Sequence, residues 1–383
     1  MDSSLAVFDA TDSVHHERML EAVELAQNAL IKTSPNPRVG CVIYTVDGQK
    51  VGWGITQPPG GDHAEIQALK RLYSHPRFPA LDPRHLILYV TLEPCTHYGR
   101  TPPCVLALLD SGIQTIFIGL KDPNPVVYQK GINQLIEAGR DVYVGVEKEA
   151  CWGLHAPFCK WIQTKRPWVS LKGAMTLDGC LATASGHSKW ITNPQAREDV
   201  HDLRSQVDAI LVGGQTARLD RPRLNVRLVD GDDPLVVVMT RFLNLPKDLP
   251  CARPGSLFFH CAQAPKKQID FWKNKGVIPI EVSLNQSGYL SIPEVLDHLG
   301  QRGVNHLLVE GGGRIHGAFI EEEVVDDLYL YVAPKIIGRG MPLFQLPSVP
   351  QIQKGVHLSH LKYETCGQDL RIYGRFPTAF SIS

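Results

Sequence analysis

The sequence lacks an excess of charge of either sign and has no apolar run long enough to cross a membrane. Lysine plus arginine and aspartate plus glutamate each number 39 among 383 residues, so the formal net charge is zero. Proteins that bind duplex nucleic acid are normally basic, which argues against a nucleic-acid partner. The longest apolar runs, such as 86–90 and 235–239, are as long as a strand and fall far short of the ~20 residues of a spanning helix. We therefore expect no membrane association.

We also expect no secretory signal, because Met1–Ser4 are acidic and polar and show neither the basic nor the apolar region of such a segment. The nine cysteines are odd in number and irregularly spaced, which does not suit a disulfide framework. Together these features predict a cytoplasmic protein with reduced thiols, some of which are metal ligands or core residues.

The chain is long enough for two or three domains, and its hydrophobic content of 43% is sufficient for real cores. Hydrophobic periodicity and turn residues predict alternating helices and strands after an opening hairpin in residues 1–150. The expected helices cover 16–31, 64–73, 105–111 and 132–138, and the expected strands cover 39–44, 50–55, 85–91, 115–120 and 141–146. This order favours an α/β sandwich around one sheet.

Residues 151–166 are predicted to form a short helical connector, and residues 167–383 repeat an α/β pattern that predicts a second domain. Its expected strands cover 168–174, 209–212, 235–239, 256–260, 278–282, 306–309 and 327–333, and its expected helices cover 194–205, 293–301 and 314–321. The helix at 194 has good initiation chemistry, since Asn193 can cap it and Pro194 suits its first position.

The clearest chemical signal is a set of three zinc ligands, His63, Cys95 and Cys104. Three protein ligands leave a fourth position open, as catalytic zinc sites do. A closed structural site with His97 as fourth ligand is the alternative, and unrelated buried cysteines are another. Glu65 decides for the open site, because a carboxylate two residues after a ligand can move protons between water and a leaving group. Zinc nucleobase deaminases have this His-x-Glu, Pro-Cys and Cys arrangement.

Eight residues separate the two cysteines, where the common deaminase pattern has two. This loop includes His97, Tyr98 and Arg100, which could hold an anionic, planar substrate beside the metal. The alternative is an ordinary solvated loop.

In the second half, single motifs are weaker. The expected strand 306–309 leads into Glu310 and three glycines before a helix, an arrangement that can bind an anion at the helix N-terminus or form a mere tight turn. Residues 220–227 form a cationic loop suited to a phosphate, or simply a solvated face. Trp190 is either a core aromatic residue or a cofactor contact.

Several motifs of the first half resemble the bifunctional riboflavin-biosynthesis deaminase/reductase family. They are Asn36-Pro37-x-Val39-Gly40, His63-Ala64-Glu65, the segment from Thr91-Leu92-Glu93-Pro94-Cys95 to Pro102-Pro103-Cys104, and Asp122-Pro123-Asn124-Pro125. The resemblance implies a cytidine-deaminase-like three-layer α/β/α fold and a pyrimidinone 5′-phosphate substrate. It further implies that the substrate site is formed by Asn36, His97, Arg100, Asp122 and Asn124. The family usually has glycine where this chain has Gln129.

The resemblance extends through the second half, over Lys172–Gly179, Ser188–Arg204, Asp220–Arg227 and Val309–Gly317. It implies a dihydrofolate-reductase-like α/β domain that uses NADPH. The residues it places against NADPH are Ala174, Trp190, Thr216, Asp220, Gly312, Gly313, Arg314, Ile315, His316, Gly317 and Ala318. Those it places against the ribosyl-phosphate substrate are Lys172, Ser188, Arg204, Leu224, Arg227 and Glu310. The family usually has aspartate where this chain has Arg221.

These observations predict a bifunctional enzyme of riboflavin biosynthesis, with a zinc-dependent deaminase in residues 1–150 and an NADPH-dependent reductase in residues 167–383. The expected partners are small pyrimidine ribosyl phosphates, and the resemblance suggests a homodimer or larger homo-oligomer. Two other functions remain open at this point. One is a deaminase that acts on a base in RNA, and the other is a non-catalytic zinc scaffold in which Glu65 is a surface carboxylate.

Overall fold

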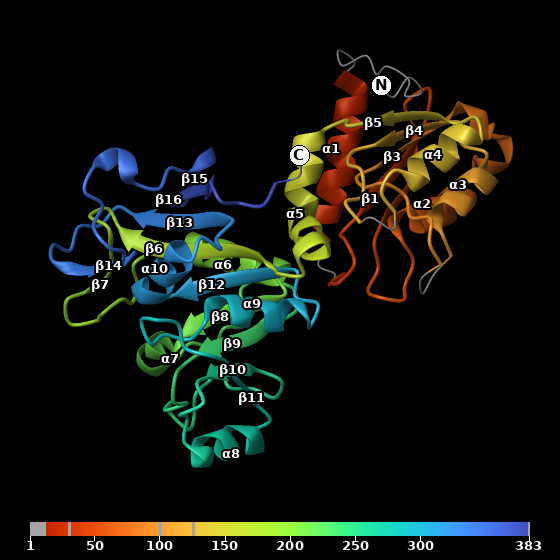
Figure 1. The fold of residues 1–383 in the computed structure, drawn as a ribbon. Helices are drawn as coiled ribbons and strands as arrows, with labels where there is room; N and C mark the ends of the chain where they lie inside the picture. The colour runs from red at the N-terminus through yellow and green to blue at the C-terminus, as the bar shows by residue number, and fades with distance from the viewer. Residues whose placement is uncertain (1–12, 30–31, 99–101, 125–126, 382–383) are drawn as a thin grey trace. The chain divides into compact units, whose positions relative to one another are not determined.

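A computed structural model describes residues 13–29, 32–98, 102–124 and 127–381 of the chain (Figure 1). Contacts between residues divide it into two compact units, one ending at Thr164 and the other running from Lys165 to Ser381. Each unit has its own sheet and is described by itself.

The first unit is built on a five-stranded sheet of order β2-β1-β3-β4-β5. Its strands are β1 (Gly40–Thr45), β2 (Lys50–Ile55), β3 (Leu86–Val90), β4 (Thr115–Ile118) and β5 (Asp141–Val144). The opening hairpin β1–β2 and the β1–β3 pair are antiparallel, whereas β3, β4 and β5 run parallel. Residues in β1 and β3 are almost all buried, which matches a sheet covered on both faces.

Five helices cover this sheet in two layers (Figure 1). Helices α1 (Ser13–Gln27) and α5 (Lys148–Thr164) lie together on one face, and α2 (Ala64–Tyr73), α3 (Cys104–Ser111) and α4 (Lys130–Glu137) lie on the other. The start of α2 lies very close to β2, since a Cβ on Gly54 would come 2.1 Å from the Ala64 carbonyl oxygen. Glycine at this position therefore fixes the height of the first turn of α2 over the sheet. Two short 3₁₀ segments, Phe78–Ala80 and Pro83–His85, precede β3.

The second unit contains a nine-stranded sheet of order β11-β10-β9-β8-β12-β6-β13-β16-β15. Its strands are β6 (Trp168–Thr176), β8 (Ala209–Gly213), β9 (Leu235–Met239), β10 (Leu257–His260), β11 (Ile278–Glu281), β12 (His306–Gly311), β13 (Asp327–Ala333), β15 (Ser359–Cys366) and β16 (Asp369–Arg375). All are parallel as far as β13, and the antiparallel hairpin β15–β16 completes one edge. Strands β7 (Cys180–Thr183) and β14 (Gly340–Pro342) form a separate pair.

The helices of this unit are α6 (Pro194–Gln206), α7 (Gly214–Asp220), α8 (Lys266–Asn274), α9 (Ile292–Gly300) and α10 (Gly313–Glu321), with a 3₁₀ turn at Ile352–Lys354. Both faces of the sheet are buried, and β8 shows how. Its residues Ala209 and Leu211 enter the core formed with α9 and α10, while Ile210 and Val212 enter the core formed with α6 and α8. Alternate side chains of one strand thus supply two opposite cores.

The predicted fold class is confirmed: a three-layer α/β/α unit is followed by a second α/β unit. Most expected elements are present within a few residues, and Asn193 does cap α6 by accepting the Ala196 N–H at 2.9 Å. The sequence did not predict strands β7, β14, β15 and β16 or helices α7 and α8. Residues 151–164 of the expected connector belong to α5, which packs on α1 in the first unit. Within the described ranges, no helix is long and apolar enough to span a membrane.

Candidate active sites

Three potential metal ligands converge in the first unit. His63 is the residue before α2, Cys95 follows β3, and Cys104 is the first residue of α3. The Nδ1 atom of His63 lies 3.2 Å from Cys104 Sγ and 3.5 Å from Cys95 Sγ. The sheet therefore brings together residues up to 41 positions apart in sequence.

These distances suit zinc. Zn–S bonds of ~2.3 Å and Zn–N bonds of ~2.0 Å in a tetrahedron place two ligand atoms roughly 3.5 Å apart. All three ligand atoms lie within 4.8 Å of one another. The Cys95 sulfur also accepts a hydrogen bond from the backbone N–H of Cys104 at 3.4 Å, as a thiolate ligand commonly does. Hydrogen bonding from Cys104, together with His63, lowers the pKa of Cys95 to about 4 despite burial. The chain thus supplies the donor set of an open zinc site.

Glu65 lies beside this cluster, in the first turn of α2, and is only 4% exposed. Burial, followed by the negative charge of Cys95, raises the pKa of its carboxyl to about 7. A buried carboxylate costs free energy unless it is paired or hydrogen-bonded. Because Glu65 is buried, its interpretation as a surface carboxylate is wrong. Its position next to the ligands suits a group that takes up and releases protons.

A second buried glutamate, Glu93, organises the neighbouring loop. Its Oε2 accepts the N–H groups of Asp122 and Gln129, both at 3.1 Å, and its Oε1 accepts those of Gly131 and Ile132 at 3.0 and 3.3 Å. One carboxylate therefore fixes the start of α4 next to Cys95. Sequence reasoning had not singled out Glu93, although a buried acid directly before Pro94-Cys95 is a usable signal.

Gln129, where the family usually has glycine, adopts a left-handed backbone with φ of 58°. This conformation explains the usual glycine, because side chains with a Cβ are disfavoured there. The Glu93 bond to the Gln129 N–H helps to hold it.

Only some of the other residues predicted for the first site lie near the metal ligands. Asp122 is buried, its pKa is raised to about 7 by burial, and its Oδ1 accepts the Asn124 N–H at 2.8 Å. The charges of Glu93 and Cys95 act on the same carboxyl, so Asp122 lies near the metal ligands. His97 is exposed two residues beyond Cys95, and Asn36 is half-buried in the turn before β1, bonded to Thr33. Arg100 lies outside the described residues.

The second unit contains a cavity of about 710 Å³ at the carboxyl ends of its parallel strands. That size fits a cofactor or a drug-sized ligand, which occupy pockets of ~300–1,000 Å³. Ligands bind at this edge of open α/β sheets. Twelve of the predicted residues line it: Lys172, Ala174, Ser188, Thr216, Asp220, Leu224, Glu310, Gly312, Gly313, Arg314, Ile315 and His316.

Two strand-to-helix turns pack closely against each other at this cavity. At the turn from β12 to α10, Gly311 and Gly312 have φ of 47° and 83°, and a Cβ on Gly312 would come 2.8 Å from Thr216 Oγ1. At the turn from β8 to α7, a Cβ on Gly213 would come 2.6 Å from Ile315. The glycines at the start of α10 carry no side chains of their own, so they form a cradle at the cavity wall where backbone N–H groups can meet an anion. A helix N-terminus of this kind is suited to the phosphates of a dinucleotide.

A buried ion pair lies beside the cradle. Arg204 Nε and Nη2 bind the two carboxylate oxygens of Glu310 at 2.6 and 2.7 Å, and both side chains are about one-tenth exposed. Although burial alone raises the pKa of Glu310, Arg204 outweighs it and sets that pKa at about 2. Burial lowers the pKa of Lys172, and Arg204 acts in the same direction. Lys172 and Glu310 both line the cavity.

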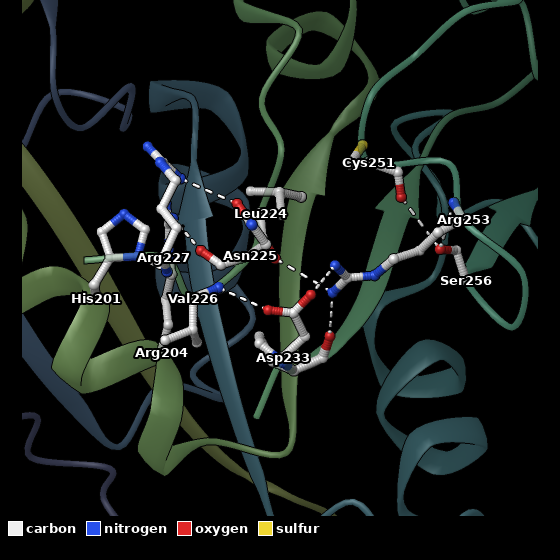
Figure 2. Close-up of polar contacts among 11 residues, drawn as sticks. His201, Arg204, Leu224, Asn225, Val226, Arg227, Asp233, Cys251, Arg253 and Ser256 are labelled. Atoms are coloured by element: carbon white, nitrogen blue, oxygen red, sulfur yellow. Dashed lines mark hydrogen bonds and ion pairs between the residues drawn. The ribbon is translucent and has the colours of Figure 1, made fainter. Parts of the chain in front are cut away.

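Further positive charge lies near this pair, and Figure 2 shows Arg204 with its neighbours Arg227 and His201. Burial, then the charges of Arg204 and Arg223, lower the pKa of Arg227. Burial and the same cationic surroundings lower the pKa of His201 to about 4, and its neutral Nδ1 accepts the Arg227 N–H at 3.2 Å. Cations are gathered against their own repulsion where an anion binds, so this cluster suits a phosphate.

Five predicted residues are not among those described as lining the large cavity: Trp190, Arg204, Arg227, Gly317 and Ala318. Trp190 is 61% exposed, so the core-aromatic interpretation is wrong, and the Arg197 guanidinium lies 4.6 Å from its ring centre. Arg204 is engaged with Glu310. Gly317 packs against the Gln345 backbone, and Ala318 lines a neighbouring cavity of about 390 Å³. Sequence reasoning missed Met239, the last residue of β9, and residues 240–242 after it. They line the large cavity, and their place at a strand end is a signal for a binding site.

Comparisons with known proteins match both units of the chain. The model of the cytidine and deoxycytidylate deaminase zinc-binding region matches residues 12–120, and the model of the RibD C-terminal domain matches residues 167–372. Riboflavin biosynthesis protein RibD of Actinobacillus pleuropneumoniae is 37% identical over 92% of this chain and 93% of its own. RibD of Escherichia coli is 35% identical over 91% and 97%. The chain belongs to the RibD family of riboflavin biosynthesis proteins.

Solved RibD structures share the architecture. Acinetobacter baumannii RibD aligns with a TM-score of 0.82 and 32% identity over 95% of this chain and 99% of its own. A diaminohydroxyphosphoribosylaminopyrimidine deaminase/5-amino-6-(5-phosphoribosylamino)uracil reductase from Thermotoga maritima aligns with a TM-score of 0.81 and 31% identity over the same shares. The RibD family thus accounts for both units and confirms the predicted pairing of a deaminase with a reductase.

Proposed function

We propose that the chain first deaminates 2,5-diamino-6-ribosylamino-4(3H)-pyrimidinone 5′-phosphate with zinc and then reduces the ribosyl group of the product with NADPH. The second product is 5-amino-6-ribitylaminouracil 5′-phosphate. The observation that carries the proposal is the cluster of His63, Cys95 and Cys104 with a buried Glu65 beside it. A closed structural zinc site has no use for that carboxylate, and the neutral overall charge counts against an RNA substrate.

In the deaminase unit, His63, Cys95 and Cys104 would hold zinc. A zinc ion in such a site lowers the pKa of bound water and so supplies a nucleophile near neutral pH. Glu65 moves protons from water to the departing amine, a role that suits its buried position and raised pKa. Asp122 and Asn124, held next to Cys95 by Glu93, bind the pyrimidinone ring together with Asn36 and His97. Arg100 binds the phosphate.

In the reductase unit, the glycine cradle at the start of α10 holds the cofactor, with Ala174, Trp190, Thr216, Asp220 and the residues from Gly312 to Ala318 around it. NADPH supplies a hydride when bound. Ser188, Leu224 and Arg227 bind the ribosyl phosphate, and Arg204 holds the Glu310 carboxylate at the cavity wall. Lys172 lines the same cavity, lies near this carboxylate and binds the substrate.

We also propose that the functional domains end near the predicted limits, 1–150 and 167–383, with the connecting helix α5 packed on α1 of the first unit, and that the protein forms a homo-oligomer. The exposed edge strand β15 supports an oligomer, because its Leu361 and Tyr363 are 46% and 61% exposed. Light scattering after gel filtration tests this point, and a monomer at micromolar concentration contradicts it.

The function is tested on the purified full chain by three readings: bound zinc, ammonia release and loss of absorbance at 340 nm, where NADPH absorbs. With the diamino substrate, ammonia is expected to appear first and NADPH to be consumed afterwards. Ammonia without later NADPH consumption contradicts the reductase assignment. NADPH consumption without ammonia contradicts the proposed order.

A further inference from the structure

The segment that follows α7 has no regular secondary structure, yet it carries two residues of the proposed reductase site. Residues 221–234 connect α7 to β9, and they include Leu224 and Arg227. Leu224 is 1% exposed and has a left-handed φ of 52°. A stretch of this length without backbone pairing must be fixed by side chains if its residues are to meet a ligand in a defined geometry.

On one side, this segment is held by groups of the site itself. Arg204 Nη1 donates to the Asn225 carbonyl at 3.1 Å, and the Arg227 N–H donates to His201 Nδ1. Arg227 Nη1 also donates to Asn225 Oδ1 at 3.1 Å. These contacts order the face of the segment that the substrate would meet.

The opposite side is held by Arg253, which comes from the turn before β10 (Figure 2). Its Nη2 donates to the Pro234 carbonyl at 2.8 Å and to the Leu224 carbonyl at 3.5 Å. Its Nη1 forms an ion pair with Asp233. The other carboxylate oxygen of Asp233 accepts the Val226 N–H at 2.8 Å. The guanidinium thus ties the two ends of the segment together and reaches Val226 through Asp233.

Arg253 itself is anchored. Its backbone N–H donates to Ser256 Oγ at 3.3 Å, and that hydroxyl donates to the Cys251 carbonyl at 3.2 Å (Figure 2). The turn therefore presents the arginine from a fixed base beside β10. We propose that Arg253 is a positioning residue of the reductase: through Asp233 and the Leu224 carbonyl, it holds the substrate-binding segment in the form that accepts the ribosyl phosphate.

This inference rests on the proposed function, since Leu224 and Arg227 are substrate residues only if the second unit is the reductase. Arg253 is 30% exposed at its side chain and Asp233 is 41% exposed. Exposed ion pairs contribute only ~0–1 kcal/mol to global stability. The effect of removing Arg253 is therefore expected in substrate binding and not in the fold of the unit.

The test uses the full chain with Arg253→Ala, Arg253→Lys and, as matched control, Arg302→Ala. Arg302 is another arginine of the second unit that donates to a backbone carbonyl, that of His298 at 2.9 Å. The KM for the deaminated ribosyl phosphate and kcat are measured at 340 nm, the Kd of NADPH by fluorescence, and ammonia release in the same preparations.

For Arg253→Ala, we expect KM to rise at least ~10-fold, because a misplacement of ~1 Å in a binding group can cost roughly 10²-fold. The Kd of NADPH and the deamination rate should stay at the wild-type values. The KM of Arg253→Lys should lie between those of the wild type and Arg253→Ala, since lysine can keep one carbonyl or carboxylate partner. Arg302→Ala should match the wild type.

A purely structural role gives a different pattern, in which kcat falls with the amount of folded enzyme while KM stays constant. That pattern, or a wild-type KM in Arg253→Ala, overturns the inference. Failure of the wild-type chain to oxidise NADPH with this substrate would instead contradict the proposed function.

Discussion

The ion pair between Arg204 and Glu310 permits a quantitative prediction. The change is Arg204→Met, which keeps an unbranched stem but removes the guanidinium that pairs with a carboxylate that is 8% exposed. The pKa of Glu310 is about 2 in the folded protein against an ordinary value of 4.5. At 1.36 kcal/mol per pKa unit, that difference corresponds to about 3 kcal/mol of stability. Loss of one partner from a buried ion pair usually costs ~3–5 kcal/mol, which agrees.

The sign of the pH dependence follows from the lowered pKa. A carboxyl whose folded pKa lies below its unfolded pKa contributes its full stability above the unfolded value, here near 4.5, and loses it as the pH falls toward 2. The difference in stability between the wild type and Arg204→Met should therefore be large at pH 7 and shrink below pH ~4.5. The double variant Arg204→Met with Glu310→Gln should recover part of the loss, because no unpaired charge stays buried.

Amide hydrogen exchange read by mass spectrometry can resolve the two units, which denaturation curves of the whole chain cannot. Peptides from β12 report the opening free energy of the reductase unit, and peptides from β3 serve as an internal control. Arg204→Met should lower the opening free energy read from the β12 peptides by about 3 kcal/mol at pH 7 and leave the value from the β3 peptides unchanged. A loss below ~1 kcal/mol would show that this pair behaves as an exposed one, and the reasoning from its burial would then be wrong.

Three further predictions concern single residues. Cys95→Ser or Cys104→Ser should remove about one zinc per chain, measured by elemental analysis, because a three-ligand site loses most of its affinity with one thiolate; full retention in both would refute the ligand assignment. Lys172→Ala should abolish NADPH oxidation while ammonia release stays at the wild-type rate, and a parallel loss of both activities in folded protein would point to one composite site. Glu93→Gln replaces an oxygen that accepts two N–H groups by an amide nitrogen that cannot accept them. The start of α4 should therefore lose ~1–3 kcal/mol of protection in hydrogen exchange, and deamination should fall while zinc is retained. Unchanged exchange in α4 would contradict the role given to Glu93.

The elements that sequence reasoning found are those with a strong local signal. Strands such as β8 are continuous apolar runs, and α6 carries both its cap, Asn193, and Pro194. The hairpin β15–β16 was missed because almost every residue of β15 is exposed, so no apolar alternation marks it. Helix α7 begins with glycine and is only seven residues long, so its sequence does not distinguish it from a loop.

The site residues likewise differ in how strong a signal the sequence gives for them. The zinc ligands and Glu65 could be predicted because their types and order carry the chemistry by themselves. The two departures from the family pattern, Gln129 and Arg221, both adopt a left-handed backbone conformation, with φ of 58° and 46°. Nothing in their side chains predicts this conformation. The contacts of Arg253 with Leu224 and Pro234 were not predictable, because they join irregular segments 29 and 19 residues apart through backbone carbonyls. Such contacts depend on the path of the chain and not on residue type.

Glu65→Gln tests the central claim, that one chain carries a catalytic zinc deaminase and an independent reductase. The amide is nearly isosteric and Glu65 is not a ligand, so zinc content should stay at the wild-type value. Ammonia release should fall by roughly 10²–10⁴, the usual contribution of general acid–base catalysis. NADPH oxidation with pre-deaminated substrate should be unchanged in the same preparation. Deamination at the wild-type rate would contradict the proton-transfer role of Glu65, and loss of zinc would show that the site is not the open, three-ligand centre described above.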